Sequence, residues 1–198
     1  MPRAVPSPSQ SGQDRLRSEL LPGEQILWTG RPEPSVLFSR IDRFLVPFSI
    51  IWTGIAFATL LQALTSPSKN ELGLPFSLVG STVGVYLVGG RFLYKRWLKT
   101  KTLCAVTNRR VLVLRENRPR ALESALIEQI PVIHKWVRQD GIGTLQFGNA
   151  RFLDAVYGST GLEPFGRVLP NKVPVFLDIR DVEKVSRLVE ERRRRDSI

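Results

Sequence analysis

The chain has 198 residues but only one cysteine, Cys104, and one histidine, His134. A single cysteine cannot form an internal disulfide, and one cysteine with one histidine cannot supply the ligands of a structural zinc site. A catalytic pair of these two residues would need a third group to orient it, and the sequence marks none. The Gly-Ser-Thr-Gly turn at 158–161 lacks the Lys-Ser/Thr of a P-loop and the spacing of a dinucleotide-binding loop. We therefore expect no catalytic site, no metal and no cofactor.

Charged residues are absent from two long stretches, 44–65 and 72–90. At 1.5 Å per residue these stretches would form helices of roughly 33 Å and 28 Å, against a hydrocarbon core of about 30 Å. Amphipathic helices of a soluble protein would carry a charged face. The sequence therefore predicts transmembrane helices at 44–65 and 72–91, joined by an external link at 66–71.

The basic residues of the chain, which give it a formal net charge of +11, gather on both sides of this pair, whereas the link holds only Lys69. Cytoplasmic flanks of membrane spans carry an excess of Lys and Arg, so we expect a two-pass protein of the inner (plasma) membrane with both termini in the cytoplasm. Aromatic residues interleave with the basic residues after the second span, as is typical of a membrane boundary. The residues that we expect to anchor the pair there are Arg40, Arg43, Arg91, Tyr94, Lys95, Arg96 and Trp97.

Small residues recur at a spacing of four in each predicted span. Gly54 and Ala58 lie in the first, and Gly80 and Gly84 lie in the second. Such pairs let helix backbones approach closely in a membrane. Because the short link already brings the two helices together, we expect these residues to face each other within the hairpin; a surface for dimerisation is the alternative.

The segments on the N-terminal side of the spans differ in composition. Residues 1–19 are rich in Pro, Ser, Gln and Arg, which predicts a disordered tail. Residues 20–43 contain a Pro-Gly turn, a short apolar run and a Gly-Arg-Pro break. We interpret this cytoplasmic juxtamembrane element as holding a strand that pairs with a later part of the chain.

After residue 101 the pattern changes to short apolar runs separated by turns, which predicts strands at 102–106, 111–114, 124–131, 132–138, 144–148 and 175–177. The Asp140-Gly141 step between two of these runs indicates a β-hairpin. A helix follows, with either Asp178 or Asp181 as its N-cap and apolar residues on one face. A basic tail at 192–198 ends the chain. The fold class is α+β, with an antiparallel sheet domain at 102–191 after the membrane hairpin.

Several motifs in this order resemble bacterial membrane proteins with a pleckstrin-homology-like domain. They are Leu-Pro-Gly-Glu at 21–24 with Leu-Trp-Thr-Gly-Arg-Pro at 27–32, Ala-Val-Thr-Asn-Arg-Arg at 105–110, the hairpin at 140–148, and Ile-Arg-Asp-Val at 179–182. The resemblance implies a β-sandwich or partly open barrel of two antiparallel sheets, capped by the C-terminal helix. In eukaryotic domains of this fold, basic residues near the early loops bind phosphoinositide phosphates. The corresponding candidates for contact with an anionic lipid or a partner are Arg109, Arg110, Arg115, Arg118 and Arg120; basic turns solvated beside an anionic membrane are the alternative.

The sequence thus indicates a non-enzymatic module anchored in the bilayer, with a protein partner or an anionic lipid as its ligand. The alternative is a membrane-associated nucleic-acid-binding protein that uses its Arg-rich tail and Trp136 with its basic neighbours Lys135 and Arg138. Since the membrane already accounts for much of the basic charge, we do not expect nucleic acid to be the partner.

Overall fold

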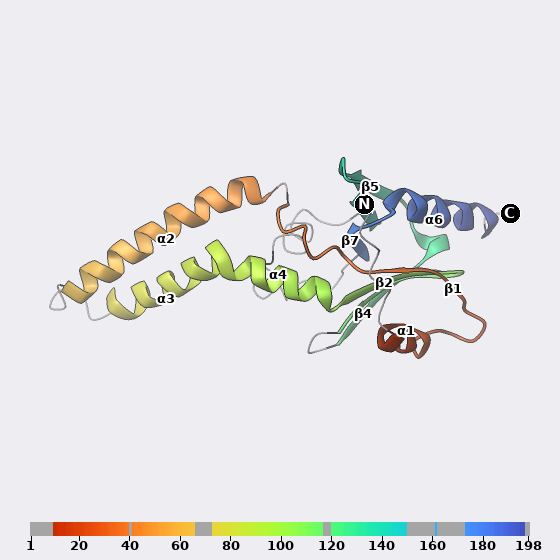
Figure 1. Ribbon diagram of the computed structural model, residues 1–198, viewed down its shortest axis with the longest axis horizontal. Coiled ribbons are helices and arrows are strands. Elements are labelled where there is room, and N and C mark those ends of the chain that lie inside the picture. The colour runs from red at the N-terminus through yellow and green to blue at the C-terminus, as the bar shows by residue number, and fades with distance from the viewer. Residues whose placement is uncertain are drawn as a thin grey trace, which may run out of the picture. The chain divides into compact units, whose positions relative to one another are not determined.

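The computed structural model describes residues 10–39, 41–65, 73–116, 120–149, 161 and 173–196. They form an α+β fold with two apolar helical segments and two antiparallel sheets (Figure 1). The chain divides into two compact units, of which the helix unit lies within Leu37–Arg96 and Val156–Arg167. The sheet unit lies within Met1–Val36, Trp97–Ala155 and Val168–Ile198.

The helix unit is built from two apolar segments. The first is α2, Asp42–Thr65. The second begins as α3, Gly73–Val85, passes through the π-helical turn η2, Tyr86–Gly90, and continues as α4, Arg91–Thr100. Both segments are long and apolar enough to cross a membrane. The helix that contains the expected second span, 72–91, continues beyond it to Thr100. The predicted link at 66–71 lies outside the described residues.

Small and hydroxyl-bearing residues form the contact between α2 and α3. Ser49 and Ala56 are the buried residues near the middle of α2, and Ser77, Ser81 and Gly84 are buried in α3. The Ser81 hydroxyl donates a hydrogen bond of 3.2 Å to the carbonyl of Ala56. Interhelical hydrogen bonds and close backbone approach are the interactions that hold helices together in lipid.

The four predicted packing residues divide between the contact and the outer surface. A Cβ on Gly84 would lie 2.7 Å from Thr53 Oγ1, and one on Gly80 would lie 3.7 Å from the Ala56 Cβ, so both glycines face α2. A Cβ on Gly54 would meet nothing within 4 Å, and Ala58 is exposed. The prediction was therefore wrong for Gly54 and Ala58: the second helix was placed correctly, but α2 presents a different face.

Seven strands lie in the described residues of the sheet unit. Sheet A has the order β1-β2-β3-β4, from Ile26–Gly30, Thr102–Thr107, Arg110–Arg115 and Ala121–Leu126. Sheet B has the order β5-β6-β7, from Ile133–Val137, Gly143–Phe147 and Val175–Ile179. All neighbouring strands are antiparallel. A short 3-10 turn, Ile127–Gln129, follows β4, and the C-terminal helix α6 covers Val182–Asp196.

The predicted β5–β6 hairpin is confirmed, with Gly141 in the left-handed region at its turn. Of the two expected N-caps, Asp178 lies within β7, whereas Asp181 directly precedes the helix that begins at Val182. The predicted tail from 192 is helical as far as Asp196.

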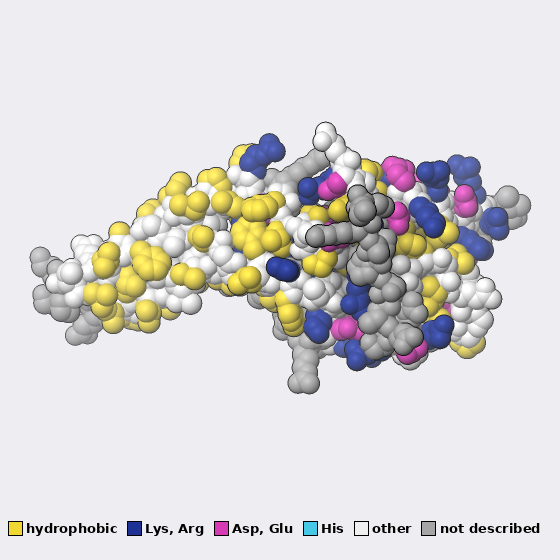
Figure 2. Space-filling view, viewed as in Figure 1, with side chains coloured by type: hydrophobic (Ala, Val, Ile, Leu, Met, Phe, Trp, Pro, Cys, Tyr) yellow, Lys and Arg dark blue, Asp and Glu magenta, His cyan; other side chains and the backbone are white. Residues whose placement is uncertain are grey.

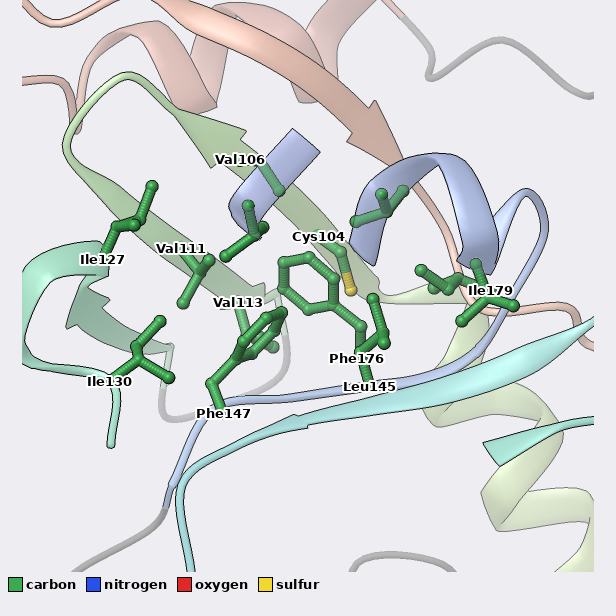
Figure 3. Packing of buried hydrophobic residues seen from close by; sticks show 13 residues of the cluster. Cys104, Val106, Val111, Val113, Ile127, Ile130, Leu145, Phe147, Phe176 and Ile179 are labelled. Atoms are coloured by element: carbon green, nitrogen blue, oxygen red, sulfur yellow. The ribbon is translucent and has the colours of Figure 1, made fainter. Parts of the chain in front are cut away.

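The hydrophobic core of the sheet unit joins both sheets and α6 (Figure 3). Phe176 of β7 lies at its centre, with its ring 4.8 Å from that of Phe147 in an edge-on arrangement and 5.8 Å from that of Trp28. Cys104 is fully buried in the same cluster. Because Trp28 belongs to β1, the segment before the membrane-spanning candidates contributes directly to this core.

The outer face of sheet A carries a second apolar cluster of Leu103, Ala105, Leu112 and Leu114. Leu16 of α1, Gln10–Arg17, covers this cluster and is fully buried there. The predicted disorder of residues 1–19 was therefore wrong for α1, because two strands that are apolar on both faces need a cover on each side.

The helix pair interrupts the chain within sheet A. β1 precedes α2, whereas β2 follows α4, and the two strands pair with Thr29 opposite Ala105 and Gly30 opposite Cys104. The predicted strand in the juxtamembrane element is thereby confirmed. The expected domain of residues 102–191 was too short, since its first strand lies at 26–30.

Candidate functional site

Two neighbouring candidate arginines, Arg109 and Arg110, occupy different environments. Arg109 lies exposed in the turn between β2 and β3, whereas its neighbour Arg110 is mostly buried. Arg110 donates from Nε to Glu24 Oε1 at 2.9 Å and from Nη2 to Glu24 Oε2 at 3.0 Å, and Nη2 also reaches the carbonyl of Glu19 at 2.8 Å. The donors of Arg110 therefore hold the fold together, and Arg109 is the member of this pair that faces solvent.

Glu24 is the centre of this buried network. Its carboxylate also accepts hydrogen bonds from the Leu21 amide at 2.8 Å and from the Thr107 hydroxyl at 2.7 Å. Burial by itself raises the pKa of Glu24, but the hydrogen bonds from Arg110, Leu21 and Thr107 outweigh it and bring the pKa below its ordinary value of 4.5. The Leu-Pro-Gly-Glu and Thr-Asn-Arg-Arg motifs are thus in contact through Glu24, Thr107 and Arg110. These residues stabilise the fold of the sheet unit.

Two of the three remaining candidate arginines, Arg115 and Arg120, lie close to carboxylates. Arg115 Nε lies 3.8 Å from Glu123 Oε1, and Arg120 Nη2 lies 3.0 Å from Glu19 Oε1. Arg118 lies outside the described residues. The structure therefore brings Arg110 and Arg120 together around Glu19, but it does not gather the candidates into one exposed cluster.

A second network in the sheet unit surrounds Lys99 of α4. Lys99 Nζ donates to Asp178 Oδ2 at 2.6 Å and to the carbonyls of Val36 at 2.5 Å and Glu33 at 3.1 Å. Arg180 binds the Glu33 carboxylate at 2.6 Å. Burial raises the pKa of Glu33, but the bonds from Arg180 and Ser35 outweigh it, so this pKa is lowered. These contacts fix the segment after β1 to β7.

The helix unit contains a buried cluster of charges, formed by Asp42 at the start of α2 with Arg91 and Lys95 of α4. The Arg91 side chain is 0% exposed and that of Asp42 is 1% exposed, with Arg91 Nη1 at 3.0 Å from Asp42 Oδ1. Lys95 Nζ lies 3.8 Å from Asp42 Oδ2 and donates to the Leu37 carbonyl at 2.7 Å. The cluster thus holds two cations and one anion.

Hydrogen bonds with Ser39 position Asp42 at the start of α2. Its Oδ2 accepts hydrogen bonds from the Ser39 amide at 2.6 Å and from the Ser39 hydroxyl at 2.7 Å. Ser-x-x-Asp before an apolar run is a helix-start pattern that the sequence contains. It is the signal by which Asp42 could have been found, and the sequence prediction missed it.

The hydrogen-bonding capacity of Arg91 is largely unused. Among the described residues, Nε, Nη1 and Nη2 of Arg91 have no hydrogen-bond partner of good geometry, and Asp42 Oδ1 has none either. The guanidinium lies 4.5 Å from the centre of the Phe92 ring, and the Phe92 ring is 5.1 Å from that of Phe38. Arg91 is therefore a desolvated cation held by one carboxylate and one aromatic face.

The π-helical turn before Arg91 is fixed by a neighbouring backbone. Tyr86 donates from its hydroxyl to the Gly161 carbonyl at 2.6 Å. A Cβ on Gly161, which has φ of 80°, would lie 2.6 Å from the Arg91 carbonyl oxygen, so glycine is required there. Single π-helical turns frequently occur at functional sites.

The other predicted membrane anchors differ in burial. Arg43, Arg96 and Trp97 are exposed, and Tyr94 is half-buried. Arg40 lies outside the described residues. Of the seven expected anchors, Arg91 and Lys95 are not exposed, because both are buried beside Asp42.

The two residues that the sequence offers for a catalytic pair, Cys104 and His134, lie in different environments. Burial raises the pKa of the Cys104 thiol to about 12, so this thiol stays protonated near neutral pH. His134 is on β5, where its Nε2 lies 3.3 Å from Asn149 Oδ1. In the described ranges, no three His, Cys, Asp or Glu residues form a group that could hold a metal.

Comparison of the chain with family models, curated proteins and solved structures found no match.

Proposed function

We propose that this chain is a non-enzymatic, two-pass integral membrane protein that presents a pleckstrin-homology-like interaction domain at the cytoplasmic membrane face. The observation that carries the proposal is the position of the apolar helix pair between β1 and β2 of one sheet unit. A domain whose first strand precedes the helix pair and whose remaining strands follow it is tethered by two connections. Such tethering raises the local concentration of the domain, so weak contacts with a partner suffice.

The exposed surface of the helices supports insertion into lipid. Large apolar side chains point outward along α2, among them Phe44, which is 79% exposed, and Leu61, which is 62% exposed. Hydrophobic side chains cover much of the visible face of α2 and α3 (Figure 2). Contiguous exposed apolar surface of this kind is rare on soluble monomers, and a bilayer supplies the solvent that it needs.

The order of the strands supports a pleckstrin-homology-like domain. Two antiparallel sheets followed by a C-terminal helix are what the resemblance implies, and the described strands and α6 are compatible with that arrangement. In the sheet unit, the surfaces suited to a protein partner are the outer strands of the two sheets. Leu122 and Leu126 are exposed on β4, and Trp136 and Val137 are exposed on β5. We therefore place protein binding first and lipid binding through Arg109 second.

Membrane insertion is tested on the full chain, because β1 is needed for the sheet. We expect the protein to stay in the membrane fraction after carbonate extraction, with reporters fused at either end both active in the cytoplasm. Release by carbonate, or an external C-terminus, would overturn the proposal.

The ligand is tested with the full chain in nanodiscs that contain or lack anionic lipid. Crosslinking in native membranes from photoreactive residues at positions 122 and 136 should recover one protein partner, with position 128, also exposed, as the control. Equal recovery from all three positions would count against these strands. Any role of Arg109 in lipid binding should appear as weaker capture of soluble anionic headgroups by Arg109→Ala.

A further inference from the structure

We propose that Arg91 is the centre of a phospholipid site, in which its guanidinium binds the phosphate of an anionic lipid at the polar end of the helix pair. The inference rests on the proposed insertion of α2 and of α3 with α4 into a bilayer. It assigns a ligand to the buried charge cluster of the helix unit, separate from the basic turn at Arg109.

The charge balance of the cluster is the first reason. Arg91 and Lys95 contribute two positive charges, and Asp42 contributes one negative charge. A buried charge is stable only when it is paired and hydrogen-bonded. One further anionic group would balance the cluster.

The free donors of Arg91 are the second reason. In the described part of the chain its three nitrogens have no hydrogen-bond partner, although the side chain is 0% exposed. Guanidinium presents a planar fork that matches two oxygens of a phosphate, and such bidentate bonds are among the strongest in proteins. The unused chemistry of the site is therefore that of an oxyanion receptor.

The surroundings of Arg91 favour a lipid over a free ion. Arg91 directly follows the apolar segment 73–90, so in a bilayer its backbone would lie near the depth of the lipid phosphates. The ring of Phe92 covers the guanidinium, and Phe38, which is 66% exposed and lies outside regular secondary structure, covers Phe92. Displacement of these two rings would admit the phosphate, while the rings would contact the glycerol and upper acyl chain.

The test compares two substitutions on the same helix. Arg91→Gln removes the proposed receptor, whereas Arg96→Gln removes the same charge from an exposed position of α4. Native mass spectrometry of the full chain, titrated with phosphatidylglycerol, measures the apparent affinity for the first bound lipid. We expect roughly a tenfold to hundredfold loss for Arg91→Gln, because charged hydrogen bonds are lost. We expect about fivefold or less for Arg96→Gln, which reports only general attraction. Equal losses in the two variants would overturn the inference.

Further titrations distinguish a lipid phosphate from a free phosphate ion as the ligand. Wild-type protein should bind phosphatidylglycerol more tightly than phosphatidylcholine, and inorganic phosphate should not compete at equal concentration. Competition by inorganic phosphate would show a free-ion site and overturn the assignment to lipid. Carbonate extraction of each variant comes first: a protein that is not integral fails the proposed function, whereas an integral protein with unchanged lipid affinity fails this inference alone.

Arg91→Gln removes the closer of the two cations beside Asp42, so a second measurement avoids dependence on the folding of this variant. Arginine side chains of the wild type are labelled with ¹⁵N, and the Arg91 Nε–H signal is assigned from Arg91→Lys, which keeps the charge. The signal should shift as phosphatidylglycerol is added and stay in place with phosphatidylcholine. An Arg91 signal that does not respond to phosphatidylglycerol would also overturn the inference.

Discussion

Replacement of Glu24 by Gln tests whether the two sequence motifs that meet at this residue stabilise the sheet unit. The carboxylate of Glu24 accepts two hydrogen bonds from Arg110, one from Thr107 and one from the Leu21 amide. Gln has only one acceptor oxygen, so its NH₂ group would take the place of the other carboxylate oxygen. Two donors, the NH₂ group of Gln and an N–H of Arg110, would then face each other at about hydrogen-bond distance. A lost hydrogen bond to a charged group costs about 1.5–3 kcal/mol, and breaking a buried ion pair costs more. We expect Glu24→Gln to lower the free energy of unfolding by about 2–3 kcal/mol.

The assay is urea-dependent pulse proteolysis of the full chain in detergent micelles, with cleavage followed in the sheet unit. Glu19→Gln is the matched control, because the Glu19 side chain, which is 32% exposed, pairs at 3.0 Å with the 49% exposed Arg120 near the surface. Exposed pairs contribute about 0.2–1 kcal/mol, so the control should change stability by less than about 1 kcal/mol. A Glu24→Gln protein as stable as Glu19→Gln would refute the structural role of this network.

The pH dependence of the same comparison supplies a second check. The pKa of Glu24 is lower in the folded chain than its ordinary value of 4.5. A lowered folded pKa contributes stability that is fully present above the unfolded pKa and is lost as the pH falls through the folded pKa. The difference between wild type and Glu24→Gln should therefore be constant near neutral pH and shrink below pH 4.5. A difference that grew on acidification would contradict the sign.

Three further outcomes follow from packing. Gly84→Val should destabilise the helix pair in detergent, because the new side chain would clash with Thr53, whereas Gly54→Val should be tolerated. The temperature at which each variant aggregates measures the difference, and equal temperatures would contradict this packing. Maleimide should label Cys104 only after the sheet unit unfolds, because the thiol is 0% exposed and has a pKa of about 12. A maleimide adduct detected by mass spectrometry on the native protein would contradict this. Leu16→Ala should cost about 2–4 kcal/mol and expose α1 to protease, whereas equal protease resistance of variant and wild type would argue against the docking of this helix.

The elements that could be predicted were those with strong local patterns. The absence of charge located both apolar helices, and the Asp140-Gly141 step located the β5–β6 hairpin. The end of the second helix was missed because Arg91 and Lys95 interrupt the apolar run. They continue the helix as an amphipathic segment whose charges pair with Asp42. Helix α1 was missed because only Leu16 marks its buried face, and one apolar residue in eight gives no periodic signal.

The candidate residues show a different limit of sequence reasoning. A basic residue beside an apolar span satisfies the positive-inside pattern whether it reaches solvent or turns inward. Exposed Arg96 and buried Arg91 are therefore alike in sequence. Likewise, Arg109 and Arg110 are adjacent, and only the distant Glu24 decides which of them is available to a ligand. Burial depends on partners far along the chain, which a local pattern does not specify.

The interruption between β1 and β2 also links the folding of the two units. β1 ends at Gly30 and pairs with a strand that begins at Thr102, so their pairing closes a loop containing the whole helix pair. Non-local pairing of this kind is slow because loop closure must precede the stabilising contacts. If the helices insert first, they shorten the distance that the chain must search, and sheet A completes at the membrane. Trp28 would then enter the core beside Phe176 only after insertion. The placement of β1 before the helix pair thus makes the completion of sheet A depend on a chain segment that contains both apolar helices.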